Sequence, residues 1–437
     1  MSKKMGFGAV LALVFGSQIG SGIFVLPATL APFGMFGVFG WAFAGLGAML
    51  LAFVFADLCS KFPQTGGPHV YVQQVFGKLT GFFVGWTYWL VSWTSTSVVI
   101  IAAIASLSAF LGNDVSPHLY LGLEIFFLAL ITAINCKSIS LAGKVEAILA
   151  LLKFIPFVLV PAVLFFHFDA KNISFSPQYA DFSTIKLIIL VTMESFWGFI
   201  GVECATAPAG AVENPSKTIP RAIVIGTFGV ALIYFINNLS VMGVIPGEML
   251  AVSKSPYVDA INLVLGENLS LVVSAITFVI MLGTANAWTL ASAQISLGLA
   301  QEKLLPAFFA KKNKDLAPYA SVLVSSIGMV PILMLSQDKN LSEQISNIID
   351  FSVEVFLMVY AMCCLAFIKI NAKDRNLMKT ALGVVAFAFC ITMILNSPIK
   401  SIIVALLFAA SGVFMLPFIR EDNLLTVAFK KNFKKAG

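Results

Sequence analysis

The sequence Phe15-Gly16-Ser17-Gln18-Ile19-Gly20-Ser21-Gly22-Ile23-Phe24 decides the fold, because it lies in the middle of the first long apolar stretch. Its three glycines and two serines stand where a membrane-spanning helix normally carries leucine or valine. We therefore predict that the helix is interrupted about half-way across the bilayer. An unpaired backbone N–H or C=O costs several kcal/mol in hydrocarbon, so such an interruption must line a cavity whose occupant completes the hydrogen bonds.

The half-helix that starts near Ser21 points its free N–H groups and the positive end of its dipole into this cavity. A carboxylate fits such a site. The alternative interpretation is a close helix–helix contact, since Gly16 and Gly20 have the GxxxG spacing. A second interruption further along the chain favours the substrate site.

The composition predicts an all-α membrane protein. The chain is 59% hydrophobic and only 11% charged, whereas an ordinary soluble domain carries about 25% charged residues. At about 20 residues per span, 437 residues accommodate about 12 transmembrane helices in one polytopic domain over residues 1–437. The predicted spans are 7–31, 36–57, 79–111, 119–135, 143–167, 184–209, 221–246, 268–300, 317–336, 347–368, 378–395 and 398–418.

The distribution of basic residues predicts the orientation. With both termini on the cytoplasmic side, the inside segments hold 21 of the 27 Lys and Arg residues and the outside segments hold five. We therefore expect a multi-pass protein of the cell (inner) membrane with its N- and C-termini in the cytoplasm. The net charge of +6 then reflects topology rather than nucleic-acid binding.

Neither a metal site nor a cofactor is predicted. The six cysteines form no CxxC pair, and the three histidines are far apart in sequence. The chain also lacks HExxH, GxSxG and P-loop motifs, so an enzyme is disfavoured. A channel is disfavoured as well, because its polar groups would line a continuous pore instead of gathering at two helix interruptions.

The second interruption lies in span 6, within residues 194–203, where Gly198 and Gly201 stand three apart between Glu194 and Glu203. Spans 1 and 6 are five spans apart. The first ten spans thus divide into two halves of opposite topology, about 7–167 and 184–368, followed by two extra helices over about 378–418 and a cytoplasmic tail, 419–437. This arrangement is typical of inverted-repeat secondary transporters.

Several motifs share one family signature. They are residues 20–27 (GSGIFVLP), the Gly66-Gly67 loop leading to Tyr71, residues 199–203 (FIGVE), Glu213-Asn214-Pro215 and Ile219-Pro220-Arg221. These motifs resemble the amino acid–polyamine–organocation (APC) superfamily along essentially the whole chain, and within it the bacterial basic amino acid/polyamine antiporters, particularly arginine/agmatine exchangers. The resemblance implies a LeuT-type 5+5 inverted-repeat fold with helices 1 and 6 broken, and exchange of an amino acid for a related amine or amino acid. A homodimer is possible by analogy with the family, but the sequence alone does not predict the oligomeric state.

The resemblance also implies site residues. Ser21 and Gly22 would bind the substrate carboxylate, and carbonyls around Ile19, Trp197 and Ile200 would hold the α-amino group. Trp197 would stack on the substrate side chain, and Trp288 would form a middle gate. The deeper cytoplasmic gate would be Tyr88, Glu203 and Tyr360, with Glu203 sensitive to protonation.

Two further positions bear on substrate choice. Thr96 in span 3 stands where arginine/agmatine exchangers have an asparagine, while Ser352 keeps a span-10 hydroxyl; Ser92, one turn before Thr96, completes the predicted binding residues. One hydroxyl in place of an amide leaves arginine selectivity open. Trp86, Trp89 and Trp93 are interpreted as packing residues.

Four charged side chains, Glu194, Glu203, Glu354 and Lys153, lie inside predicted spans, where each costs about 2.5–3.5 kcal/mol unless it is paired, protonated or hydrated. Lys153 resembles a span-5 lysine of sodium-independent superfamily members, which predicts that its ammonium substitutes for a sodium ion. The role of Glu194 and Glu354 is left undecided by the sequence. The three alternatives are that they pair with each other, with Lys153 or with a cationic substrate.

The leading functional hypothesis is sodium-independent exchange of a cationic amino acid (arginine, ornithine or lysine) for its amine or another amino acid. The alternative is a proton-coupled importer of neutral amino acids, with Lys153 or Glu203 as the proton-linked group. Counterflow distinguishes the two hypotheses.

The linker between spans 2 and 3 also carries a pattern. The sequence Pro63-Gln64-Thr65-Gly66-Gly67-Pro68 predicts a turn, and the residues after it predict a short amphipathic segment that lies along the membrane surface. The alternatives are an ordinary linker and a hinge of the inner gate at Gly66-Gly67.

Overall fold

The computed structural model describes residues 4–107, 110, 116–253, 256–266, 270–335 and 341–419. Its regular structure within these ranges is helical. The α-helices are α1 (Phe7–Gln18), α2 (Gly22–Leu30), α3 (Met35–Lys61), α4 (Pro68–Phe76), α5 (Lys78–Ala105), α7 (Pro117–Lys137), α8 (Ile139–Leu164), α9 (Thr184–Phe196), α10 (Pro215–Val244), α11 (Gly247–Ala251), α12 (Pro256–Leu265), α13 (Ser270–Gln301), α14 (Tyr319–Leu335), α15 (Leu341–Lys373), α16 (Leu377–Asn396) and α17 (Ile399–Ala410).

Short 3₁₀ helices connect or extend these elements. They are η1 (Phe165–His167), η2 (Ala170–Asn172), η3 (Pro177–Tyr179), η4 (Trp197–Phe199), η5 (Cys204–Thr206), η6 (Ala209–Ala211), η8 (Ala307–Ala310) and η9 (Ser411–Phe418). Two isolated β-bridges join Met5 to Val212 and Phe33 to Phe175.

Eleven helical stretches of the described residues are long and apolar enough to cross a membrane. They agree with the predicted spans apart from a few residues at each end, and the protein is therefore a multi-pass membrane protein. The ninth predicted span, 317–336, corresponds to α14, an apolar helix of only 17 residues. The count of 12 spans thus stays a prediction, and the predicted tail lies outside the described residues except for residue 419.

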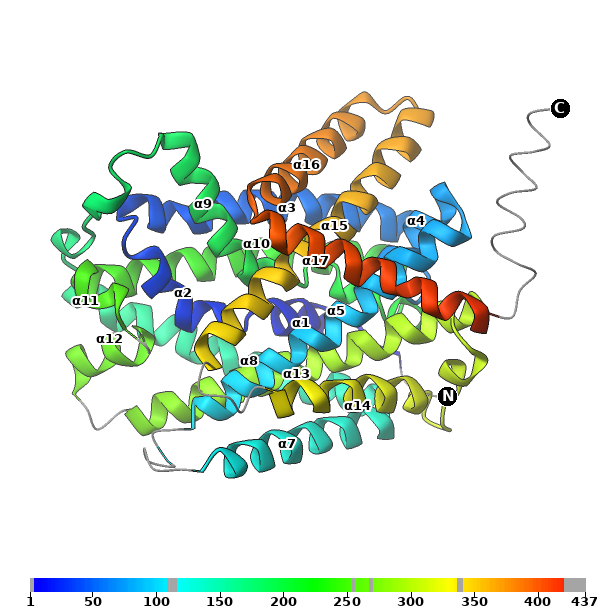
Figure 1. Cartoon of the computed structure of the whole chain (residues 1–437). Helices are drawn as coiled ribbons and strands as arrows, with labels where there is room; N and C mark the ends of the chain where they lie inside the picture. The colour runs from blue at the N-terminus through cyan, green and yellow to red at the C-terminus, as the bar shows by residue number, and fades with distance from the viewer. Residues whose placement is uncertain are drawn as a thin grey trace.

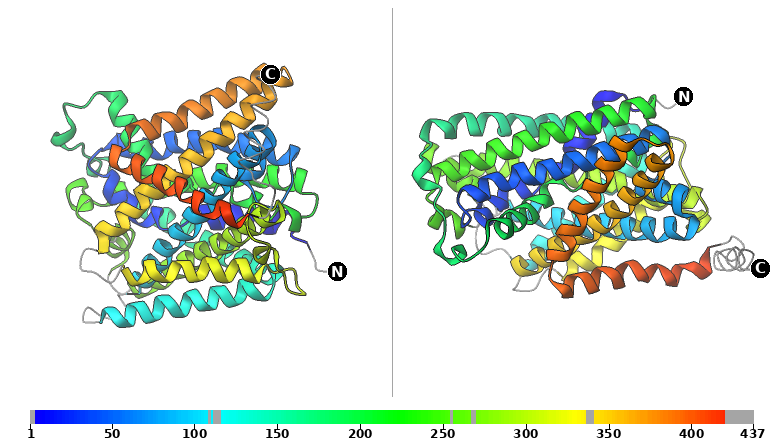
Figure 2. Two further views of the ribbon diagram at one scale, coloured as in Figure 1. Left: turned by 45° about the vertical axis from the view of Figure 1, so that its right-hand side comes forward. Right: turned by 90° about the horizontal axis from the view of Figure 1, so that it is seen from above.

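The helices form one bundle with the interrupted first span inside it. Figures 1 and 2 show α1 surrounded by longer helices, while α7 and α17 lie at the edge. α1 packs against α8, α10 and α13. The buried share of each span agrees with this central or peripheral position. In the first span 78% of the most apolar window is buried, whereas the share is 22% in α7 and 11% in the last span. The Gly- and Ser-rich stretch is therefore in the most enclosed part of the protein.

The amphipathic segment of the linker between spans 2 and 3 does not lie along the surface as predicted. It forms α4, which packs against α5 and α15. The first half of α4 is buried, including His69 and Tyr71, which are both 0% exposed. The physical reason is that α5 and α15 cover both faces of the first half of α4, while Gln74 and Phe76 in its second half are exposed.

Candidate functional site

The first span is interrupted at the predicted stretch. Helix α1 ends at Gln18, and Ile19 is extended, with φ −78° and ψ 99°. Helix α2 begins three residues later, at Gly22. The first residues of α2 therefore have N–H groups without an intrahelical acceptor, and the last carbonyls of α1 have no intrahelical donor.

Side chains of three other helices bind these last carbonyls. Lys153 comes from α8, Tyr234 from α10, and Thr284 and Trp288 from α13. Gly16 O accepts from Lys153 Nζ (2.9 Å), Ser17 O from Trp288 Nε1 (3.0 Å) and Gln18 O from Tyr234 OH (2.7 Å). Ile19 O accepts two hydrogen bonds, from Lys153 Nζ (3.0 Å) and from Thr284 Oγ1 (2.7 Å). The end of α1 is thus capped by the protein itself.

Lys153 makes more hydrogen bonds at this helix end than the other three side chains do. Its side chain is completely buried, and its ammonium also donates to Thr284 Oγ1 at 2.9 Å, so all three N–H bonds have acceptors. Two backbone carbonyls and a threonine hydroxyl are oxygen ligands of the kind that bind a small cation. The ammonium therefore supplies a positive charge among ligands suited to a metal ion.

The sixth span is interrupted as well. Helix α9 ends at Phe196, η4 covers Trp197–Phe199, and Ile200 is extended with φ −60° and ψ 131°. Gly201 has a φ of +106°, and a Cβ atom there would lie 3.1 Å from both Ser17 and Trp288. Glycine is therefore required by conformation and by space.

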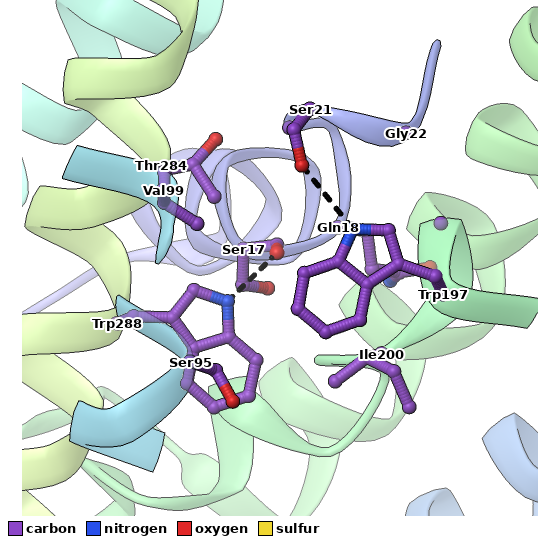
Figure 3. Close-up of a pocket in the computed structure, with 12 residues that line it drawn as sticks. Ser17, Gln18, Ser21, Gly22, Ser95, Val99, Trp197, Ile200, Thr284 and Trp288 are labelled. Carbon is purple, nitrogen blue, oxygen red and sulfur yellow. Dashed lines mark hydrogen bonds between the residues drawn. The ribbon is translucent and has the colours of Figure 1, made fainter. Parts of the chain in front are cut away.

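The two interruptions meet at a small cavity of about 20 Å³. This volume holds a single water molecule rather than an amino acid, so a substrate enters only if the walls move. Figure 3 shows Trp197 and Trp288 on two sides of the hollow, with Trp197 Nε1 donating to Ser21 Oγ at 3.2 Å. The lining residues are Ser17, Gln18, Gly20, Ser21, Gly22, Ser95, Val99, Trp197, Gly198, Ile200, Thr284 and Trp288.

Some predicted binding residues line this cavity and others do not. Ser21, Gly22, Trp197, Ile200 and Trp288 do. The predicted residues outside the lining are Ile19, Ser92, Thr96 and Ser352.

Those outside the lining have other surroundings. The carbonyl of Ile19 is already bound by two side chains, which leaves it poorly placed for a substrate amine. The hydroxyls of Ser92 and Thr96 donate back into α5, to Trp89 O and Ser92 O, both at 2.7 Å. Ser352 Oγ is buried and has no hydrogen-bond partner among the described residues.

The sequence interpretation missed part of the lining, namely Ser17, Gln18, Gly20, Ser95, Val99, Gly198 and Thr284. Helical spacing was the available signal for two of them. Thr284 lies one turn before Trp288 on α13, and Ser95 lies beside Thr96 on α5. A rotation of α5 by one residue replaces Thr96 with Ser95 at the cavity.

The three residues predicted to form the deeper gate are hydrogen-bonded to one another in the structure. Tyr88 OH donates to Glu203 Oε1 at 2.7 Å, Tyr360 OH donates to the other carboxyl oxygen, and all three side chains are completely buried. The ring centroid of Phe356 lies 5.3 Å from the ring centroid of Trp288 and 6.1 Å from that of Tyr360. A continuous aromatic layer thus connects the cavity wall to the gate.

The other predicted intramembrane carboxyls lie outside the cavity. Glu194 is exposed, whereas Glu354 is 1% exposed and neither of its oxygens has a hydrogen-bond partner in the described part of the chain. Within those residues no ion pair joins either carboxyl to Lys153. The sequence interpretation overlooked a different acidic residue, Glu146, which is 1% exposed on α8.

The loop before α4 is hydrogen-bonded to the residues that follow the second interruption. Gly66 N donates to Ala207 O at 2.9 Å, and Gly210 N donates to Thr65 Oγ1 at 3.0 Å. His69 is buried behind this loop. Burial lowers the pKa of His69 from 6.5 to about 4, because the charged imidazolium loses its hydration.

The described residues contain no group of three or more His, Cys, Asp or Glu side chains that would hold a metal ion.

A family model described as amino acid permease matches residues 5–424. The chain belongs to the amino acid permease family. The permease is accordingly a membrane transporter and not an enzyme.

Curated relatives match the permease over most of its length. The cadaverine/lysine antiporter of Escherichia coli (strain K12) is 27% identical over 404 residues, which cover 91% of the permease and 90% of that protein. The putrescine transporter PotE of Haemophilus influenzae is 27% identical over 362 residues, 83% of each chain. The putative arginine/ornithine antiporter of Bacillus subtilis is 26% identical over 406 residues, 86% of each chain.

Proposed function

We propose that the permease is a sodium-independent exchanger that moves a cationic amino acid (arginine, ornithine or lysine) in one direction and its amine, or another amino acid, in the other. The similarity to two antiporters and one putrescine transporter supports this substrate class. The observation that carries the proposal is the cavity between two interrupted helices, which is lined by one helix N-terminus and two tryptophans.

The carboxylate of the amino acid would bind at the start of α2. Gly20, Ser21 and Gly22 line the cavity there, and the first N–H groups of a helix attract anions through hydrogen bonds and the helix dipole. Decarboxylated amines lack this group, so they would bind through the rest of the cavity.

The cationic side chain would lie against the aromatic walls. Trp197 and Trp288 come from different helices and face the same hollow. Each ring offers a cation–π attraction of about 0.5–2 kcal/mol. The α-amino group would bind polar atoms close to Trp197 and Ile200.

The lysine at the first interruption supports sodium independence. Lys153 already donates to Gly16 O and Ile19 O, and its fixed charge would replace a bound sodium ion. Tyr88, Glu203 and Tyr360 would form the gate below the substrate, with Trp288 as the middle gate.

We further propose the membrane arrangement that goes with this function. The permease would lie in the cell inner membrane with both termini in the cytoplasm. Residues 7–167 and 184–368 would form the inverted repeats, with the last two helices outside them and association into a homodimer.

Counterflow in proteoliposomes tests the proposal. Vesicles loaded with unlabelled agmatine, putrescine or cadaverine are expected to take up labelled arginine, ornithine or lysine, with the same rate in sodium and in potassium buffer. Vesicles without protein serve as control. A competition panel that adds neutral amino acids identifies the substrate pair.

Two results would contradict the proposal. One is uptake of neutral amino acids into empty vesicles, driven by a pH gradient, which would favour the proton-coupled importer. The other is uptake that requires sodium, which would remove the proposed role of Lys153.

A further inference from the structure

A second buried charge lies beside the first interruption. Glu146 is two helical turns before Lys153, so both side chains are on the same face of α8. Its Oε2 accepts a hydrogen bond from Asn286 Nδ2 at 2.9 Å, and Asn286 Oδ1 accepts one from Asn135 Nδ2 at 3.0 Å. The carboxyl is thus held in a fixed orientation by α13 and α7.

The free oxygen of this carboxyl points at α1. Glu146 Oε1 has no hydrogen-bond partner among the described residues. A Cβ atom on Gly16 would lie only 1.7 Å from it, so the carboxyl occupies the space that any side chain at Gly16 would need. Gly16 therefore separates the two charges: its Cα faces Glu146, and its carbonyl accepts from Lys153.

The ammonium of Lys153 needs a counter-charge. Its three acceptors are neutral, and a lone ammonium buried in a membrane protein is strongly disfavoured. Glu146 is the buried carboxyl on the same face of α8, and the Gly16 backbone against its Oε1 carries the carbonyl that Lys153 binds. Within the described part of the chain the two groups form no direct ion pair, so they act on each other across the Gly16 peptide. Among the described residues, the thiol of Cys204 in η5 also interacts with Glu146. α1 and α13, between which the carboxyl lies, carry no titratable side chain. α7 and α10, which also pack against α8, carry titratable side chains that include Cys136 and Tyr234.

We propose that Glu146 is the resident counter-ion of Lys153, a positioning residue that keeps the ammonium charged and so lets the permease operate without an inorganic cation. Glu146 does not touch the substrate. It acts through Lys153, which in turn fixes the two carbonyls at the end of α1. No proton is consumed in this role, because both side chains stay ionised.

The transport test rests on the proposed exchange and uses the pH profile. Without the carboxylate, Lys153 loses its proton more readily, and exchange requires the charged form. For Glu146→Gln we expect exchange within about threefold of wild type near pH 6 and about 10-fold below wild type near pH 8.5. Glu146→Asp keeps the charge and is expected to restore most of the exchange at the higher pH.

Glu124→Gln is the matched control, because Glu124 is also a buried carboxyl, 3% exposed, on α7. We expect it to behave like wild type at both pH values. Loss of exchange by the same factor at both pH values in Glu146→Gln, or no loss at all, would overturn the proposal, because a packing role alone does not depend on pH.

A spectroscopic test does not depend on transport or on the folding of Glu146→Gln. Infrared difference spectra of purified wild type against Glu146→Asp near pH 7.5 are expected to show paired carboxylate bands. Paired bands of a protonated acid would overturn the proposal. Should the wild type fail to exchange amines, the proposed function falls, and the infrared result still decides the role of Glu146.

Discussion

The two helix interruptions are held in different ways. At the first, side chains from three neighbouring helices bind the carbonyls of residues 16–19, and the buried ammonium of Lys153 binds two of them. At the second, the contacts are fewer: Ser17 Oγ donates to Gly201 O at 3.2 Å, and Gly201 N donates to Tyr360 OH at 3.4 Å. Just below it, the Glu203 carboxyl accepts from two tyrosines.

This difference suggests a division of labour. The carbonyls of the first interruption are already bound by fixed partners, so the groups left for the proposed substrate are mainly the N–H groups at the start of α2. The second is held through Ser17 and Tyr360, and the residues that we propose as the gate, Tyr88, Glu203 and Tyr360, are hydrogen-bonded just beside it. We therefore expect substitutions at the first interruption to remove activity and those near the second to modulate it.

The largest effect is expected for Lys153→Met. This change removes three hydrogen bonds, each worth about 1.5–3 kcal/mol with a charged donor, and leaves two buried carbonyls without that donor. Exchange in proteoliposomes should fall at least about 100-fold, and the melting temperature should fall as well. Lys400→Met, on an exposed position of α17, is the control. Wild-type exchange by Lys153→Met would mean that the first interruption needs no fixed cation.

The next effect is expected for Trp288→Phe. The substitution keeps an aromatic ring in the cavity wall but removes the N–H group that donates to Ser17 O. The phenyl ring is also smaller than the indole ring, so it offers a bound cation a weaker cation–π attraction. Exchange should fall about 10-fold, equivalent to about 1.4 kcal/mol. Trp86→Phe is the matched control, since Trp86 donates to Ser411 Oγ at 2.9 Å outside the cavity. Equal rates for the two variants would remove Trp288 from the gate.

A smaller effect is expected for Tyr360→Phe at the second interruption. The hydrogen bond from Tyr360 to the Glu203 carboxyl is lost and Gly201 N loses its acceptor, while Tyr88 still donates to the carboxyl. We expect a three- to tenfold change in exchange rate with unchanged affinity for substrate, measured by binding to the purified protein. Tyr319→Phe, on α14, serves as the control. A loss as large as that of Lys153→Met would end the distinction between the two interruptions.

The smallest effect is expected at His69, behind the loop that is hydrogen-bonded to the residues after the second interruption. Its pKa is about 4 when folded and 6.5 when unfolded. The unfolded chain therefore binds the extra proton first, and stability falls as the pH drops from about 6.5 towards 4. Wild type should lose about 2–3 kcal/mol more than His69→Leu over this range, visible in thermal unfolding. Parallel unfolding curves for both proteins would exclude this contribution.

The sequence predicted the spans and both interruptions because apolar length and small-residue clusters are local signals. Glycines and serines at residues 16–22 and 195–201 mark the interruptions, and the charged residues mark the span ends. α4 was misjudged for a tertiary reason: its amphipathic pattern is the same whether lipid or protein covers the apolar face.

The finer details of the site depend on how helices are rotated about their axes. Thr96 and Ser95 are adjacent, and no local pattern decides which of them faces the cavity. The donors to the α1 carbonyls come from residues far away in sequence, such as Tyr234 and Thr284. Glu146 was overlooked although its spacing to Lys153 on one helix face was a usable signal.

A cryo-electron microscopy map of the permease in lipid nanodiscs with its transported amino acid tests the central claim most directly. We predict substrate density between Trp197 and Trp288, with its carboxylate within hydrogen-bond distance of the N–H groups of Ser21 and Gly22. Substrate bound elsewhere, or residues 7–30 forming one uninterrupted helix, would contradict the account.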